Sequence, residues 1–370
     1  MASSRVACAS FNLGTNTTIT ITRDNKAYTH TLTYKFGSKT GTIATKTTST
    51  SVVWSPTAST LYAQIPNAVS GYGTITCQTY NGNTLIGTTT AGFYAYAVKS
   101  ACVPTVTATI VDTNATSIAL TGDSSKLICY LSKPKVTLTT TAKNSATIKS
   151  TLIHNYGGGL TATTTPYTFD TVLSKEWRCT ATDSRGYSTT TTYNVDFVAY
   201  EPCHFTTIPT IKRTESTSTT ATLTIKGYCF KGSFGVVTNT LTLKYRYKTA
   251  IGSYGSYVTV TPTWNADGTF TATPSVPNLS LSEQYTFEVI AQDKLTSFGD
   301  GEGIILGQGT GDLRIGKDYV QTKNDLIIGD TTNTIWRGIK ARRKITNAGV
   351  TKSYTSLFGI GNVGNTATAS

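Results

Sequence analysis

The segment WRCTATDSRGYST, residues 177–189, looks at first like a reactive site. It places the thiol of Cys179, the carboxylate of Asp183, the hydroxyl of Ser184 and the guanidinium of Arg185 within seven residues. Its alternating polar and apolar residues are also typical of a half-buried β-strand, and the Asp and Gly that follow suit a hairpin turn. Whether the segment is a site or a turn depends on the rest of the chain.

Two other segments share this layout, YGTITCQTYNGNTLIGTTT at 72–90 and YTFEVIAQDKLTS at 285–297. In all three, an alternating strand runs into a turn, at Asn81, Asp183 or Asp293. These turns are separated by 102 and 110 residues, which is about the length of an immunoglobulin-like domain. The repeat therefore predicts three such domains and identifies 183–186 as a turn.

The same alignment places Cys179 opposite Cys77 and Val289. Valine at this position fits a buried strand residue and not a catalytic thiol. The chain has seven cysteines, an odd number without a CxxC pair, so we expect neither a zinc site nor a complete set of disulfides. We expect the cysteines to be small buried apolar residues: Cys8, Cys77, Cys102, Cys129, Cys179, Cys203 and Cys229.

Strand-length alternating runs recur along the chain, for example TNTTITITR at 15–23 and LTLKYRYK at 241–248. Prolines at 104, 202 and 209 interrupt these runs, and proline is confined to strand edges and connections. The predicted fold class is all-β: tandem immunoglobulin-like β-sandwiches at 1–100, 101–200 and 201–298 in an extended rod. A glycine-rich β or irregular segment at 299–370 follows, which we expect to serve attachment or oligomerisation.

The chain is basic, with 32 Lys and Arg against 19 Asp and Glu and a formal net charge of +13. The excess favours anionic partners, but most charges are scattered singly along strands, and we expect no nucleic-acid ligand. The one dense run, RGIKARRK, is predicted to form a short helix over 335–344. Its cations are candidate contacts for an anionic partner, with the solvated face of a helix as the alternative: Arg337, Lys340, Arg342, Arg343 and Lys344.

Other functional classes find little support in the sequence. The three histidines, His30, His154 and His204, lie in different modules or in a linker, without the nucleophile and acid spacing of a catalytic triad. We expect no enzymatic activity, cofactor or metal. No run of about 20 apolar residues and no signal-like N-terminus occur, so we expect synthesis in a cytoplasm and no membrane insertion.

Longer strings carry a family resemblance. THTLTYKFGSKTGTIATKTTSTSVVW at 29–54 and QIPNAVSGYGTITCQTYNGNTLIGT at 64–88 resemble the first module of siphovirus minor structural proteins, tail-fibre-like chains of phages that infect Gram-positive bacteria. SKPKVTLTTTAKNSATIKSTLI with TATDSRGYSTTTTYNV resembles the second module, and ATLTIKGYCF with LTLKYRYKTAIGSY the third. LRIGKDYV resembles the glycine-containing segment that often follows, so the resemblance covers most of residues 10–320.

This resemblance implies a virion component made in the host bacterial cytoplasm, with no family-wide enzymatic activity and no site residues to carry over. We expect a tail fibre or tail-tip component that projects from the particle and contributes to host adhesion; the alternative is a decoration protein that stabilises the capsid or tail. Expected partners are other virion proteins, a host-surface glycan or wall polymer, and copies of the chain in a trimer. The loop tips at 81–83, 156–159 and 250–256 are the predicted contact points.

Overall fold

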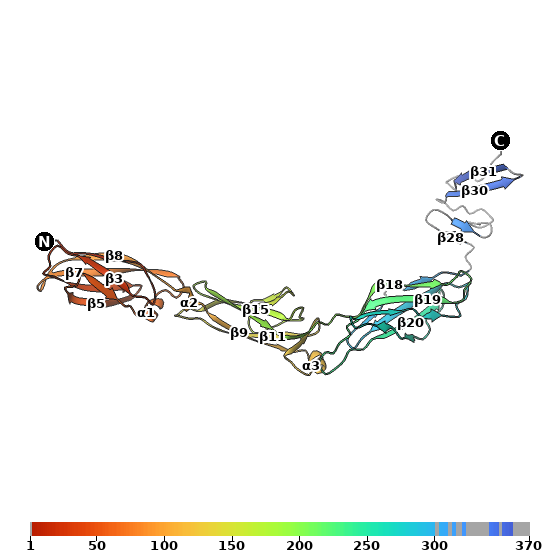
Figure 1. Cartoon of the computed structure of the whole chain (residues 1–370), viewed down its shortest axis with the longest axis horizontal. Helices are drawn as coiled ribbons and strands as arrows, with labels where there is room; N and C mark the ends of the chain where they lie inside the picture. The colour runs from red at the N-terminus through yellow and green to blue at the C-terminus, as the bar shows by residue number, and fades with distance from the viewer. Residues whose placement is uncertain are drawn as a thin grey trace.

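The computed structural model describes residues 2–299, 303–309, 313–315, 320–322, 340–347 and 350–357. Within these residues the regular secondary structure is mostly β-strand, and the helices are short: α1 (Ala58–Tyr62), α2 (Lys99–Cys102) and α3 (Ala115–Thr121). Figure 1 shows three β-sandwiches arranged end to end along the longest axis of the molecule. The all-β, tandem sandwich architecture predicted from the sequence is confirmed.

The first sandwich packs a three-stranded sheet against a five-stranded sheet. In β3 (Thr17–Thr22) the side chains of Ile19 and Ile21 are buried, and Thr18, Thr20 and Thr22 are exposed, as expected from the two-residue period of a strand. The three-stranded sheet has the order β1 (Arg5–Cys8), β3, β6 (Ser51–Trp54). The five-stranded sheet has the order β2 (Phe11–Asn12), β8 (Thr84–Tyr96), β7 (Ser70–Asn81), β4 (Tyr28–Phe36), β5 (Lys39–Thr47).

The second sandwich is built in the same way around Trp177, which is fully buried. One sheet has the order β14 (Tyr167–Thr168), β11 (Pro134–Thr141), β9 (Thr105–Asp112). The other has the order β13 (Leu160–Ala162), β12 (Ile148–Tyr156), β15 (Glu176–Asp183), β16 (Ser188–Asn194). A short parallel pair, β10 (Lys126–Ile128) and β17 (Asp196–Val198), closes the end that faces the third sandwich.

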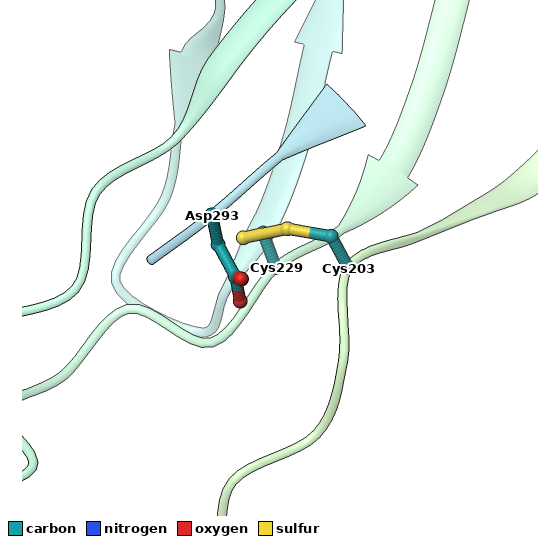
Figure 2. A group of neighbouring side chains, drawn as sticks. All are labelled: Cys203, Cys229 and Asp293. Atoms are coloured by element: carbon teal, nitrogen blue, oxygen red, sulfur yellow. A yellow bond between two sulfur atoms is a disulfide. The ribbon is translucent and has the colours of Figure 1, made fainter. Parts of the chain in front are cut away.

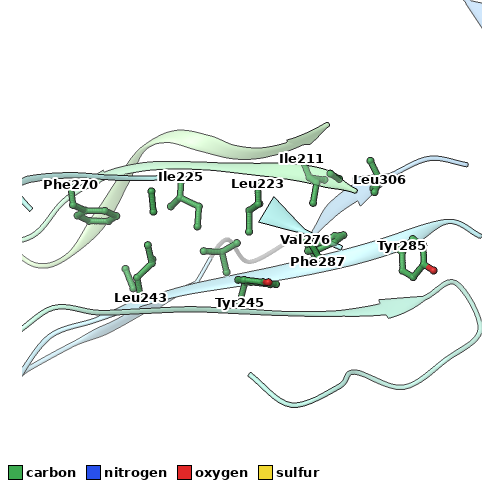
Figure 3. Close-up of a cluster of buried hydrophobic side chains, with 14 of the residues drawn as sticks. Ile211, Leu223, Ile225, Leu243, Tyr245, Phe270, Val276, Tyr285, Phe287 and Leu306 are labelled. Carbon is green, nitrogen blue, oxygen red and sulfur yellow. The ribbon is translucent and has the colours of Figure 1, made fainter. Parts of the chain in front are cut away.

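The third sandwich has the largest core. Figure 3 shows Leu223 and Ile225 on one sheet pointing toward Leu243 and Tyr245 on the other. One sheet has the order β18 (His204–Arg213), β19 (Ala221–Tyr228), β23 (Thr269–Ala272), β22 (Thr263–Trp264), with β24 (Ser275–Val276) also paired to β19. The other has the order β21 (Val258–Val260), β20 (Thr242–Thr249), β25 (Tyr285–Gln292), β26 (Ser297–Gly299). A further strand, β27 (Ile304–Leu306), pairs with β25, so this sheet includes residues beyond the boundary predicted at 298.

The repeat found in the sequence corresponds to one structural position. The three aligned segments form β7, β15 and β25, each of which has paired strands on both sides. The aligned side chains of Cys77, Cys179 and Val289 are all completely buried. Burial raises the pKa of Cys179 to about 11, so its thiol stays protonated and unreactive near neutral pH. Cys179 is a core residue, as the alignment predicted.

The C-terminal residues that the structure describes form two antiparallel strand pairs, β28 (Leu313–Ile315) with β29 (Val320–Thr322), and β30 (Lys340–Asn347) with β31 (Val350–Leu357). The helix predicted over 335–344 is wrong where it can be compared, because residues 340–344 lie in β30. The strand is favoured by β-branched Ile345 and Thr346 and by a partner strand with Val, Thr and Tyr that begins after only two intervening residues.

Candidate functional site

The turn after β15 is closed by the carboxylate of Asp183. Its Oδ1 accepts hydrogen bonds from the backbone N–H groups of Arg185, at 3.0 Å, and Tyr187, at 2.8 Å. Gly186 has a φ of 90°, a backbone conformation that residues with a side chain rarely adopt. The segment that looked like a reactive site is therefore a turn, as the repeat predicted.

The side chain of Arg185 gives this turn a second role. It is only 7% exposed, and its guanidinium lies between the first and second sandwiches. It donates hydrogen bonds to the carbonyl oxygens of Ile65, at 3.0 Å, and Tyr62, at 3.3 Å, in the first sandwich. It also donates to the carbonyls of Lys143 and Asn144 in the second. A charged donor that bonds two buried carbonyls of the first sandwich, and is held by two carbonyls of its own domain, is a specific fastening between the two domains.

Neighbouring residues complete this first joint. Ser184 Oγ donates to the carbonyl of Pro66 at 2.6 Å, and Tyr187 Oη donates to the carbonyl of Ala97 at 3.2 Å. Asn144 Nδ2 donates to the carbonyl of Ala101 at 2.9 Å. Polar contacts on both sides of the linker hold the second sandwich in a fixed orientation against the first.

The second joint uses the corresponding turn of the third sandwich. Asp293 Oδ1 accepts the backbone N–H of Leu295 at 2.8 Å, as Asp183 does in its own turn. Its Oδ2 accepts the hydroxyl of Tyr200, from the preceding linker, at 2.9 Å, and Asn239 Nδ2 at 3.3 Å. Tyr200 is 3% exposed, and burial raises the pKa of its hydroxyl, which stays a neutral donor to the carboxylate.

A small apolar core also spans the second joint, formed by Ile128, Cys129, Val198, Tyr200 and Phe234. The backbone N–H groups of Val236 and Val237 donate to the carbonyl of Leu120, at 3.1 and 3.3 Å, so the third sandwich bonds directly to the end of α3. At Gly235 a Cβ atom would lie 2.4 Å from the carbonyl oxygen of Thr121. Glycine is required there by this close approach of two backbones.

Two of the seven cysteines are buried as predicted but are bonded to each other, a pairing that the expectation of no complete disulfide set left open. Cys203 and Cys229 form a disulfide that ties the linker to the end of β19, beside Asp293 (Figure 2). Four cysteines, Cys77, Cys102, Cys129 and Cys179, are buried and free as predicted, whereas Cys8 is half-buried. The three side chains in Figure 2 lie close enough to suggest a metal site, but a closed disulfide offers no thiolate ligand.

A serine and histidine contact is the nearest approach to catalytic chemistry. Ser4 Oγ lies 2.9 Å from His30 Nε2, but the two residues are 2% and 0% exposed. His30 Nδ1 has no hydrogen-bond partner within the described residues, so the third member of a triad is missing there. Burial lowers the pKa of His30 and favours the neutral ring. The pair stabilises the first sandwich and has no route to a substrate.

A row of tyrosines lies on the outer face of the first sandwich. Tyr72 and Tyr94 are directly opposite each other on β7 and β8, with ring centroids 5.4 Å apart, and Tyr96 follows at 6.3 Å from Tyr94. The three residues are 58%, 48% and 43% exposed. A Cβ atom at Gly92 would lie 2.2 Å from the Tyr72 hydroxyl, so this glycine makes room for the ring. Exposed aromatic rings beside rows of threonine can contact both the apolar and hydroxyl faces of a sugar.

The contact residues predicted from the sequence are dispersed. Lys340, Arg342, Arg343 and Lys344 lie along β30, and Arg337 lies outside the described residues. The three predicted loop tips lie at the surface, with Tyr156 41% and Ile251 100% exposed. The residues that form the two joints were not predicted from the sequence. The signal that could have pointed to these residues is the aspartate that recurs at the turns of the second and third domains, where the first domain has Asn81.

Sequence comparison identifies the family. Residues 2–291 match the family described as "Siphovirus protein of unknown function (DUF859)", and the chain belongs to this family of phage proteins. This agrees with the siphovirus resemblance seen in the sequence. Comparison with curated proteins finds no match. In the described part of the chain, no helix has the length and apolar character needed to cross a membrane.

Several solved structures share the tandem arrangement at low identity. They include the three N-terminal domains of the bacteriophage RB49 Highly Immunogenic Outer Capsid protein, which are 9% identical. That match covers 82% of this chain and 95% of that chain, with a TM-score of 0.23. Mouse cadherin-23 EC22-24 is 14% identical; the match covers 82% of this chain and 95% of that chain, with a TM-score of 0.25. Sidekick-1 immunoglobulin domains 1-5 are 11% identical, with a TM-score of 0.30. The match covers 83% of this chain and 60% of that chain, so the protein spans about 60% of the length of that structure. At these TM-scores the likenesses support no statement about function.

Proposed function

We propose that the chain is a structural component of the siphovirus particle, a tail fibre or tail-tip protein that projects as a stiff rod and helps the phage adhere to its host. The observation that carries the proposal is the pair of fastened joints. Domains connected by flexible linkers move independently by default, and buried bonds that cross both linkers oppose that motion. A stiff rod holds its distal surface away from the particle.

Adhesion is supported by the tyrosine row of the first sandwich. Tyrosine offers a large contact area with few rotatable bonds, so binding costs little side-chain entropy. Tyr72, Tyr94 and Tyr96 form an exposed aromatic surface suited to a neutral glycan. Each such contact is weak, and many copies on one particle would raise the overall affinity without any new contact. We propose no catalytic step, because the serine and histidine pair is buried.

Attachment of the purified chain to host cells tests this proposal. We expect saturable binding, competition with phage infection, and loss of binding in a Tyr72→Ser/Tyr94→Ser variant. Tyr130→Ser is the matched control, because Tyr130 is 57% exposed but lies away from the row. A chain that is incorporated into particles but neither attaches to cells nor blocks infection would instead be a decoration protein.

A further inference from the structure

The outer face of the third sandwich carries a row of cations that no role described so far uses. Alternate positions of β20 are occupied by three cations, Lys244, Arg246 and Lys248. The positions that alternate with them hold buried Leu243 and Tyr245 and half-buried Tyr247. Because side chains two residues apart point to the same side of a strand, the three cations share one face. Their spacing along the strand is about 6.6 Å per step, from two residues at roughly 3.3 Å each.

Two tyrosines from the segment that follows β20 alternate with these cations. The Tyr257 ring centroid lies 4.8 Å from Lys244 Nζ and 4.5 Å from Arg246 Cζ. The Tyr254 ring centroid lies 4.6 Å from Arg246 Cζ and 4.9 Å from Lys248 Nζ. Each ring thus contacts two successive cations. We call these five residues the cation–tyrosine ladder.

The ladder keeps most of its positive charge. Glu288, opposite Arg246 on β25, pairs with its guanidinium and accepts the hydroxyl of Tyr257 at 3.1 Å. The positions opposite Lys244 and Lys248 are Ile290 and Thr286, which are uncharged. Within the part of the chain that the structure describes, no carboxylate lies within ion-pair distance of either lysine. The three cations of the ladder are therefore opposed by a single anion, Glu288, in the described part of the chain.

We propose that the cation–tyrosine ladder binds a linear anionic polymer of the bacterial surface whose units are linked by phosphodiesters. This inference rests on the adhesive function proposed above and assigns it a second site. A straight row of cations at regular spacing matches a polymer with regularly spaced phosphates, and the two unpaired lysines provide the charge complementarity. Tyr254, which faces Arg246 and Lys248, lies in the loop tip at 250–256 predicted as a contact point.

Nucleic acid, another phosphodiester polymer, is the less suitable occupant. Binding of single strands without sequence preference depends on aromatic rings that are free to stack on bases. Here both rings already contact two cations each, at 4.5 to 4.9 Å. Recognition through the ladder is therefore by charge and spacing and not by base stacking.

Binding of the full chain to purified glycerol-phosphate polymer, measured over a range of salt concentrations, tests the inference. We expect salt-sensitive binding that weakens roughly thirtyfold at low salt in a Lys244→Gln/Lys248→Gln variant, the effect expected for two cations near a polyanion. Lys212→Gln/Lys226→Gln is the matched control, because it removes the same charge from exposed positions on the other sheet of this sandwich. The control should bind like the unaltered chain.

A Lys244→Arg/Lys248→Arg variant keeps the charge and should keep the binding, which separates loss of charge from loss of folding. Unchanged binding in the glutamine variant, loss of binding in a folded arginine variant, or stronger binding to single-stranded DNA than to the polymer would overturn the inference. Host-cell attachment distinguishes the two proposals. If cells bind the glutamine variant and the unaltered chain equally, the ladder site fails and adhesion stands. If the lysines bind polymer but the chain does not attach to cells, adhesion fails and the site stands.

Discussion

Replacement of Arg185 by glutamine should release the first joint. The change removes two hydrogen bonds across the joint, to the carbonyls of Tyr62 and Ile65, which then keep only their local bonds from the backbone N–H groups of Ile65 and Ala68. Asp183 Oδ2, 3.9 Å from the guanidinium, also loses its nearest cation. Two bonds from a charged donor are worth about 3 kcal/mol. This is roughly a hundredfold shift toward the open joint.

Hydrogen exchange in the full chain measures this shift directly. The amides of Gln64 and Ile65 lie in the part of the first sandwich that Arg185 contacts. We expect exchange of peptides covering 58–68 and 183–187 to accelerate by up to about a hundredfold, with little change in the core of β7. Small-angle scattering should show a wider range of end-to-end distances, because the domains then reorient.

Arg178→Gln is the matched control for this prediction. Arg178 lies on β15, the strand that leads into the turn of Arg185, but its side chain is 40% exposed and pairs with Glu176 at the surface. Exposed pairs contribute from nothing to about 1 kcal/mol, so the control should leave the joint closed. If the two variants exchange at the same rate in the joint, Arg185 does not fasten the domains and the stiffness derived from it is wrong.

Three further changes test other parts of the structure. Cys179→Val should fold normally, whereas Cys179→Asp should unfold the second sandwich in thermal denaturation, because it buries an unpaired charge; a stable aspartate variant would contradict the core assignment. Gly235→Ala should loosen the second joint by about 1 to 3 kcal/mol, seen as faster exchange around 118–121, since its Cβ would overlap the Thr121 carbonyl; unchanged protection would argue against this contact. Cys203→Ser should lower the stability of the third sandwich by about 3 kcal/mol and abolish the effect of a reductant on its Tm; equal sensitivity in both proteins would mean that the disulfide does not form.

The strands and their repetition could be predicted because they depend on local pattern. Alternation of apolar and polar residues identified β7, β15 and β25, and the presence of Val289 at the position of Cys179 indicated burial without any knowledge of the contacts. The helix expected over 335–344 failed because the basic run suited a helix locally, whereas the pairing of β30 with β31 decided its conformation.

The joints could not be predicted because their contacts are distant in sequence. Arg185 lies 120 residues from Ile65, and a turn sequence does not reveal that its side chain will be buried in a neighbouring domain. Cys203 and Cys229, 26 residues apart, pair because a linker and a strand end meet in three dimensions. The cation–tyrosine ladder combines a strand pattern visible in the sequence with two rings whose placement depends on the path of a loop.

Localisation of the chain on purified siphovirus particles by electron cryomicroscopy, with an antibody fragment bound to the first sandwich, tests the proposed function most directly. We predict that the fragment lies away from the particle surface, at the end of a projecting rod of three domains. Particles that lack the chain, or that carry its three sandwiches flat against the capsid or tail, would contradict the proposal.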